Sequence, residues 1–149
     1  MGLFSGLLGR GADTTLDVGT AVMIPMVAGM LADGSIDDDE VRQIRAICIF
    51  SPIFARNSVD RDTEIIMKAI RIVEDQGAEI ACGLAREFLS PALRETAFVN
   101  AVKLVFSDGH VGSKEQRTVE NLDRWLSLGD GRARMLIEAV SIMQHGANA

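Results

Sequence analysis

Apolar residues recur every three or four positions along most of the chain. Ile65, Ile66, Ala69, Ile70 and Val73 follow this spacing, which is typical of the buried face of a helix. No stretch alternates apolar and polar residues for long, and the sequence contains no tyrosine, a residue that favours strands. The pattern therefore predicts an all-α protein.

Two stretches are apolar enough to predict helices inside the core. Residues 18–32 form an uncharged run of 15 residues, which is shorter than the roughly 18 needed to suggest a membrane span. We therefore expect a core helix there, with Pro25 as a point where it could bend or break. Residues 101–106 have little polar interruption, so a central helix is expected there too.

Proline, glycine and capping residues set the expected helix ends. Seven helices with short connections follow: about 16–32, about 38–50, from Ser58 or Asp60 to near Gly77, one ending near Leu89, one beginning at Ser90-Pro91, one closed by Gly129, and one from Asp130 to Gly146. Together they predict a compact single-domain bundle. The helical domain is expected over 15–146, after a flexible N-terminal segment at 1–14.

One motif occurs twice, at an offset of 75 residues. The first motif (33–40) reads DGSIDDDE and the second motif (108–115) reads DGHVGSKE, so both contain Asp-Gly-x-(Ile/Val)-x-x-x-Glu. Each copy follows an apolar helix and precedes an amphipathic one. The sequence therefore predicts two pseudo-repeated helix–loop–helix units.

Turn formation alone accounts for part of each motif. Gly34 and Gly109 follow helices, where glycine is the usual left-handed terminator. Ile36 and Val111 are expected to tuck each loop against the core. These four positions therefore need no ligand to explain them.

The acidic residues at the following helix starts differ between the copies. Asp37 and Glu40 have the spacing of a capping box. In the second motif Gly112 has no side chain with which to cap, and with Ser113 as the cap, Glu115 does not fall at the third position. Capping therefore explains the first motif better than the second.

The leading aspartates point to a positive partner. Asp33 and Asp108 stand at helix C-termini, where a carboxylate opposes the helix dipole at a cost of roughly 0.3–1 kcal/mol. Two such placements suggest that an arginine or a bound cation compensates each one.

The motif also matches the second half of a calcium loop, in which glutamate follows glycine by six positions. The acidic first half is missing from both copies, so neither loop alone can enclose an ion. Water completes each site, or the two loops share one. Oxygen ligands favour a hard cation, Ca²⁺ or Mg²⁺, and the candidate ligands are Asp33, Asp37, Glu40, Asp108 and Glu115.

Two such motifs in an all-helical chain of 149 residues resemble the TerB tellurite-resistance family and the wider TerB-like superfamily. The resemblance covers about 16–143 and is specific only at the motifs. It implies a single helical domain, acidic residues that bind a divalent cation, and a role in resistance to tellurite and other stresses near a TerC-type membrane partner. Gly112 departs from the Ser, Thr or Asp usual at that helix cap.

Charge and cysteine usage narrow the setting. The chain carries 15 Lys+Arg against 21 Asp+Glu, a net charge of −6, which argues against a nucleic-acid partner. Cys48 and Cys82 stand far apart in apolar helical stretches, as expected of small buried hydrophobes in a reducing cytoplasm. The apolar segment 2–8 is a candidate for contact with the inner face of a membrane or with a partner.

These observations give three functional hypotheses. The first is a non-enzymatic, TerB-like stress-response module that binds a divalent cation through its two acidic loops. The alternative is a metal-independent helical adaptor that docks a membrane or chaperone partner. The weakest is a hydrolase that uses paired carboxylates and a cation, since the sequence contains no recognisable nucleophile motif.

Overall fold

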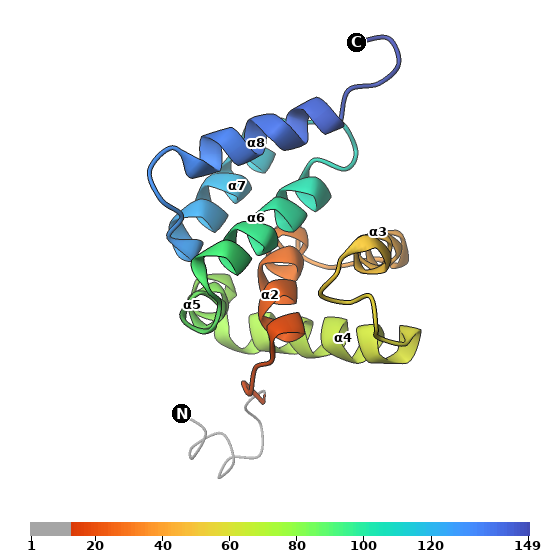
Figure 1. Cartoon of the computed structure of the whole chain (residues 1–149), viewed down its shortest axis with the longest axis vertical. Coiled ribbons are helices and arrows are strands. Elements are labelled where there is room, and N and C mark those ends of the chain that lie inside the picture. The colour runs from red at the N-terminus through yellow and green to blue at the C-terminus, as the bar shows by residue number, and fades with distance from the viewer. Residues whose placement is uncertain (1–12) are drawn as a thin grey trace.

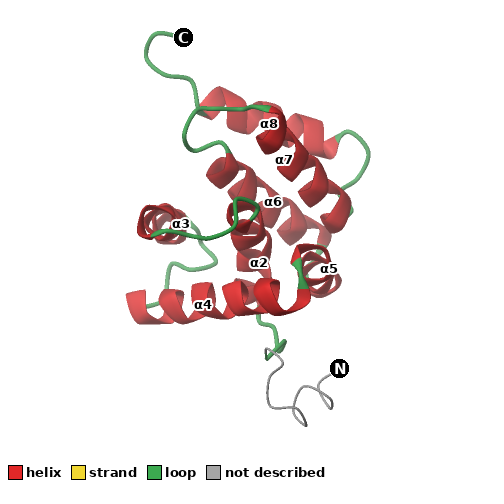
Figure 2. Cartoon of the chain, turned by 180° about the vertical axis from the view of Figure 1, so that it is seen from behind, coloured by secondary structure: helices red, strands yellow, loops and turns green. Residues whose placement is uncertain are grey.

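Helices make up the regular structure of the chain, and the residues that the computed structural model describes, 13–149, contain no strand (Figures 1 and 2). The helices are α2 (Val18–Leu31), α3 (Asp38–Phe50), α4 (Val59–Gln76), α5 (Ala78–Phe88), α6 (Pro91–Val105), α7 (Ser113–Leu126) and α8 (Arg132–Met143). The all-α prediction is therefore confirmed, and residues 13–149 contain the seven helices that the sequence predicts. The predictions for residues 1–12, including a membrane contact at 2–8, lie outside the described residues.

Helix α2 forms the centre of the bundle. Its residues 20–30 are all buried, and it packs against α4, α5 and α6 (Figure 1). The helix runs without a break through Pro25. Gly29 allows a close approach, because a Cβ there would lie 3.0 Å from the Val105 side chain. The core-helix prediction for 18–32 is confirmed. Residues 101–106, at the end of α6, are also largely buried, as predicted, where that helix packs on α2.

The surrounding helices bury one face each, and their caps mostly follow the sequence. Ser58 and Ser90 cap α4 and α6 through hydrogen bonds from backbone N–H groups at 3.0 and 3.3 Å. The prediction that Asp130 caps the last helix is wrong. Gly131, with a φ of 76°, occupies the N-cap position, so α8 begins one residue later than an Asp130 cap would require.

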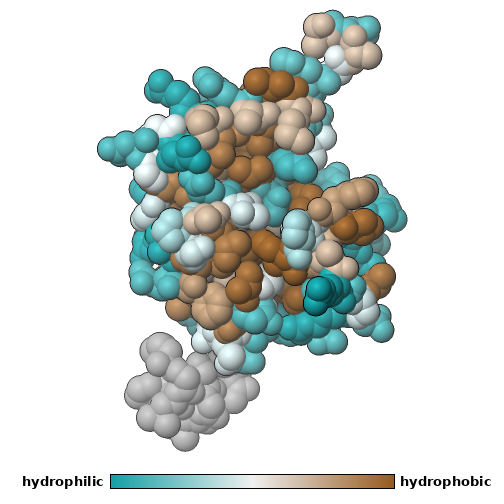
Figure 3. Space-filling model, in the orientation of Figure 1, coloured by the Kyte–Doolittle hydropathy of each residue, from teal (hydrophilic) through white to brown (hydrophobic). Residues whose placement is uncertain are grey.

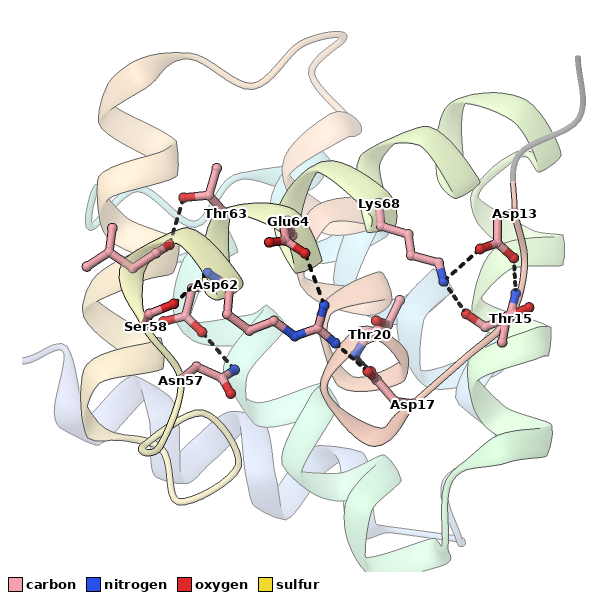
Figure 4. A network of polar contacts seen from close by, with 12 residues as sticks. Asp13, Thr15, Asp17, Thr20, Asn57, Ser58, Asp62, Thr63, Glu64 and Lys68 are labelled. Atoms are coloured by element: carbon pink, nitrogen blue, oxygen red, sulfur yellow. Dashed lines mark hydrogen bonds and ion pairs between the residues drawn. The ribbon is translucent and has the colours of Figure 1, made fainter.

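The entry to α2 is fastened to α4 by a polar network (Figure 4). Asp17 caps the first turn of α2 and accepts a hydrogen bond from Arg61 at 2.7 Å. Lys68 donates to the Asp13 carboxylate at 3.3 Å and to the Thr15 carbonyl at 2.5 Å. Hydrogen bonds from Thr15 and Lys68 lower the pKa of Asp13 to about 2. The chain is thus tied to the bundle from Asp13 onward.

The two cysteines are structural. Cys48 and Cys82 are free and buried, and burial raises the pKa of each thiol to about 12. Because the thiolate is the reactive form, both side chains act as small hydrophobes.

Within residues 13–149, no helix combines the length and the apolar character that crossing a membrane requires.

A candidate cation site between the two acidic motifs

The glycines of the two motifs are required by the backbone. Gly34 has a φ of +111° and Gly109 a φ of +77°, values that side chains with a Cβ rarely adopt. A Cβ at either position would meet nothing within 4 Å. Both glycines therefore let the chain turn after a helix, as the sequence predicts.

The two motifs line one cavity, although they are 75 residues apart in sequence. This acidic cavity has a volume of about 170 Å³ and lies where the ends of α2 and α6 meet the beginnings of α3 and α7. Four of the five predicted ligands line it: Asp33, Glu40, Asp108 and Glu115. The sequence left open whether the two loops form separate sites or share one. Because both motifs line the same cavity, they lie where a shared site would require them.

Lys114 of the second motif also lines the acidic cavity. The Lys114 ammonium forms an ion pair with the Asp33 carboxylate, and this pairing raises the pKa of Lys114. Nearby, the Ser107 hydroxyl donates a hydrogen bond to the Gln43 side-chain oxygen at 2.9 Å. The two helix–loop–helix segments are thus joined across the cavity.

Lys114 was not among the residues predicted for the site. An arginine or a bound cation was expected beside Asp33, and the partner is a lysine of the other motif. A signal was present, because the position equivalent to Lys114 in the first motif is Asp39. A charge reversal at matching positions of two acidic motifs marks a residue that can pair across them.

The first motif forms the capping box that its spacing predicts. The Asp37 carboxylate accepts a hydrogen bond from the Glu40 N–H at 2.8 Å, and the Glu40 carboxylate accepts one from the Asp37 N–H at 3.1 Å. Asp37 does not line the acidic cavity. Its carboxylate fixes the start of α3, and its assignment as a metal ligand stays a prediction.

The second motif forms only half of that box. The Gly112 N–H donates to the Glu115 carboxylate at 2.8 Å, so Glu115 has a structural role that the sequence analysis missed by placing the cap at Ser113. A Cβ on Gly112 would lie 3.0 Å from His110 Nε2 and 3.2 Å from the Glu115 carboxylate. Glycine therefore replaces the usual capping residue where His110 and Glu115 occupy the space.

Asp108 lacks a cationic partner within residues 13–149. Asp108 accepts a hydrogen bond from the His110 N–H at 2.9 Å, and no ion pair to it forms within residues 13–149. The acidic cavity therefore holds four carboxylates against the single ammonium of Lys114. Three negative charges remain uncompensated among its lining residues.

The residue types that line the cavity suit a hard cation, but their side chains do not form a group with the geometry of a metal site. Residues with carboxylate and hydroxyl side chains, including Ser107 and Thr118, line the acidic cavity, and oxygen ligands are those that Ca²⁺ and Mg²⁺ prefer. Nowhere in the described part of the chain, however, do three or more His, Cys, Asp or Glu side chains form a group able to hold a metal. Binding would require Lys114 to leave Asp33 and the carboxylates to converge.

No protein-family model, curated protein or solved structure matches the chain. The resemblance to the TerB family therefore depends on the two motifs alone.

Proposed function

We propose that the protein is a non-enzymatic, TerB-like stress-response module that binds one divalent cation, Ca²⁺ or Mg²⁺, in the acidic cavity. One observation carries the proposal: two acidic motifs that lie far apart in sequence contribute four acidic residues to the lining of one cavity, together with a single lysine.

Electrostatics favours the exchange of Lys114 for a divalent ion. A cavity with three uncompensated negative charges attracts cations, and carboxylates held near one another repel until a positive charge lies between them. An ion with two positive charges neutralises more of this repulsion than one ammonium does. Asp108 and Glu40, neither of which has an ion pair within residues 13–149, are the carboxylates with most to gain.

The consequence of binding would be a closer union of the two motifs. The ion would bridge the turn that follows α2 and the turn that follows α6, and Lys114 would be released into solvent. This change would present a defined surface to a partner. From the family resemblance we propose a TerC-type membrane protein as that partner, a cytoplasmic location beside the membrane, and a role in resistance to tellurite or related stress.

Metal removal tests the proposal. The chelator-stripped protein should melt at a higher temperature after Ca²⁺ or Mg²⁺ is added, because binding to the folded state stabilises it by RT ln(1 + [L]/Kd), about 2.7 kcal/mol at a hundredfold excess over Kd. For a chain of this size that corresponds to about 5–10 °C. The Asp33→Asn/Asp108→Asn double variant should lose the shift.

A matched control is Asp60→Asn/Asp130→Asn, which removes two exposed aspartates outside the acidic cavity. This variant should keep the cation-induced shift in full. A melting curve that millimolar cation leaves unchanged in the wild-type protein would contradict the proposal.

An unchanged melting curve would favour the alternative function, a metal-independent adaptor. A separate observation supports that alternative. Ile49 and Phe50, at the end of α3, are 69% and 87% exposed, and hydrophobic side chains reach the surface at this helix (Figure 3). A second cavity of about 510 Å³, which Phe50 lines, lies between α3 and α6. Exposed large apolar side chains next to a cavity are typical of protein interaction sites.

A further inference from the structure

A largely apolar cavity lies on another side of the turn that follows α2. Its volume is about 310 Å³, and residues of α2, α4, α5 and α7 enclose it. Its apolar lining consists mainly of Ala28, Leu31, Val73, Ala78, Leu122 and Trp125. Sites for small ligands have volumes of roughly 300–1,000 Å³ and linings of this kind. We call it the Trp125 cavity.

Few polar groups line the Trp125 cavity, and only one of them is charged. Glu74 is exposed on α4, and within residues 13–149 it makes no ion pair or side-chain hydrogen bond. Thr118 and Asn121 of α7 contribute neutral polar groups. The cavity thus combines an apolar interior with one available negative charge.

Trp125 adds a second preference for positive charge. Indole binds cations better than the other aromatic side chains do. The Trp125 ring is partly buried, and its Nε1–H is buried without a hydrogen-bond acceptor. Packing rather than hydrogen bonding therefore holds the indole at the cavity.

The neighbouring charges disfavour an anionic ligand. Thr118 and Ala32 line both the Trp125 cavity and the acidic cavity, so the two share part of a wall. An anion in the Trp125 cavity would face Glu74 and lie close to the carboxylates beyond that wall. An inorganic cation would lose its hydration against an apolar lining that returns few ligands.

We propose that the Trp125 cavity binds a small organic cation, an ammonium group carried on a compact aromatic or branched alkyl body. The apolar body fills the space between α2, α5 and α7, and the ammonium lies between Glu74 and the indole. This site is separate from the proposed divalent-cation site and does not depend on it.

Benzylammonium is the probe, with benzyl alcohol and benzoate as its neutral and anionic counterparts. Trp125 is the only tryptophan in the chain, so its fluorescence reports on the cavity directly. Benzylammonium should change that fluorescence in a saturable way. Benzyl alcohol should bind about three- to tenfold more weakly, because it lacks the attraction to the carboxylate and the ring, and benzoate should not bind.

Two variants assign the charge preference to Glu74. In Glu74→Gln the affinity for benzylammonium should fall to near that for benzyl alcohol. Glu138→Gln, which removes an exposed carboxylate of α8 outside the cavity, should leave it unchanged. The Asp33→Asn/Asp108→Asn variant should also bind benzylammonium normally, which separates this site from the acidic cavity and from the proposed function.

A filling variant tests the location. Ala78→Leu places a larger side chain at the cavity lining and should abolish binding, with a melting curve to confirm that the variant is folded. If it fails to fold, Glu74→Gln still decides the question. Equal affinity for benzylammonium and benzyl alcohol, no effect of Glu74→Gln, or no saturable fluorescence change in the wild-type protein would overturn the proposal.

Discussion

The two acidic motifs share a pattern of residues but do different physical work. In the first motif, Asp33 is neutralised by Lys114 and a complete capping box fixes the start of α3. In the second motif, Asp108 has only a backbone hydrogen bond, and Glu115 supplies half a box. The same spacing therefore produces a fully capped turn whose leading aspartate is ion-paired in one place, and a half-capped turn whose leading aspartate has no ion pair in the other.

The two motifs also differ in the burial of the apolar residue that follows each glycine by two positions. Ile36 is partly buried and packs against the core, whereas Val111 is 44% exposed. The prediction that both residues tuck their loops against the core is thus confirmed for Ile36 and wrong for Val111. Each motif contributes two acidic residues to the lining of the acidic cavity, and the second motif also contributes Lys114, which pairs with Asp33 of the first.

The largest expected difference between the motifs lies in their caps. Asp37→Ala removes a capping carboxylate and should lower the free energy of unfolding by about 1 kcal/mol. Gly112→Ala removes no hydrogen bond, and its new Cβ would meet only the movable ends of His110 and Glu115. Its effect should be a few tenths of a kcal/mol. Urea denaturation of each variant measures both values.

Asp38→Ala is the matched control, since it removes a carboxylate from the same turn of α3 without removing the cap. It should destabilise the protein by less than Asp37→Ala does. Equal losses in Asp37→Ala and Gly112→Ala would mean that the two caps are equivalent, and the division between the motifs would fail.

An effect of comparable size is expected from the lysine that joins the motifs. Lys114→Gln removes the ammonium that competes for Asp33, so the affinity for Ca²⁺ or Mg²⁺ should rise by about three- to tenfold. Lys103→Gln removes a lysine that does not line the acidic cavity and should change the affinity by less than twofold. Titration of each variant with the metal gives the comparison.

The pH dependence of this effect follows from the raised pKa of Lys114. A raised folded-state pKa means that the contribution of the ion pair is fully present below the unfolded value of about 10.4 and is lost as pH rises through the folded value. The gain in affinity from Lys114→Gln should therefore be the same at pH 7 and pH 9. A gain that disappears between these values would contradict the competition.

The helical bundle could be predicted because its causes are local. Three-to-four spacing marked the buried faces, and Ser58, Ser90 and Asp37 marked helix starts, since a cap depends on residues within one turn. Asp130 misled because glycine can also begin a helix, and nothing in the sequence ranks Gly131 above its acidic neighbour.

The candidate sites could not be predicted from the sequence alone, because they depend on how the helices pack. The motif spacing identified the four carboxylates, but their meeting at one cavity depends on how α2 and α6 pack together. Lys114 was missed because its partner lies in the other motif. The Trp125 cavity left no sequence signal, because its lining comes from four helices and each of those residues has the composition of ordinary core.

The most direct test of a shared site is its stoichiometry. Isothermal titration of chelator-stripped protein with Ca²⁺ and with Mg²⁺ should give one cation per chain, and Asp33→Asn or Asp108→Asn alone should each weaken that single event. Two cations per chain, each lost with a different aspartate, would mean that the motifs act separately, and no binding heat with either metal would contradict the account.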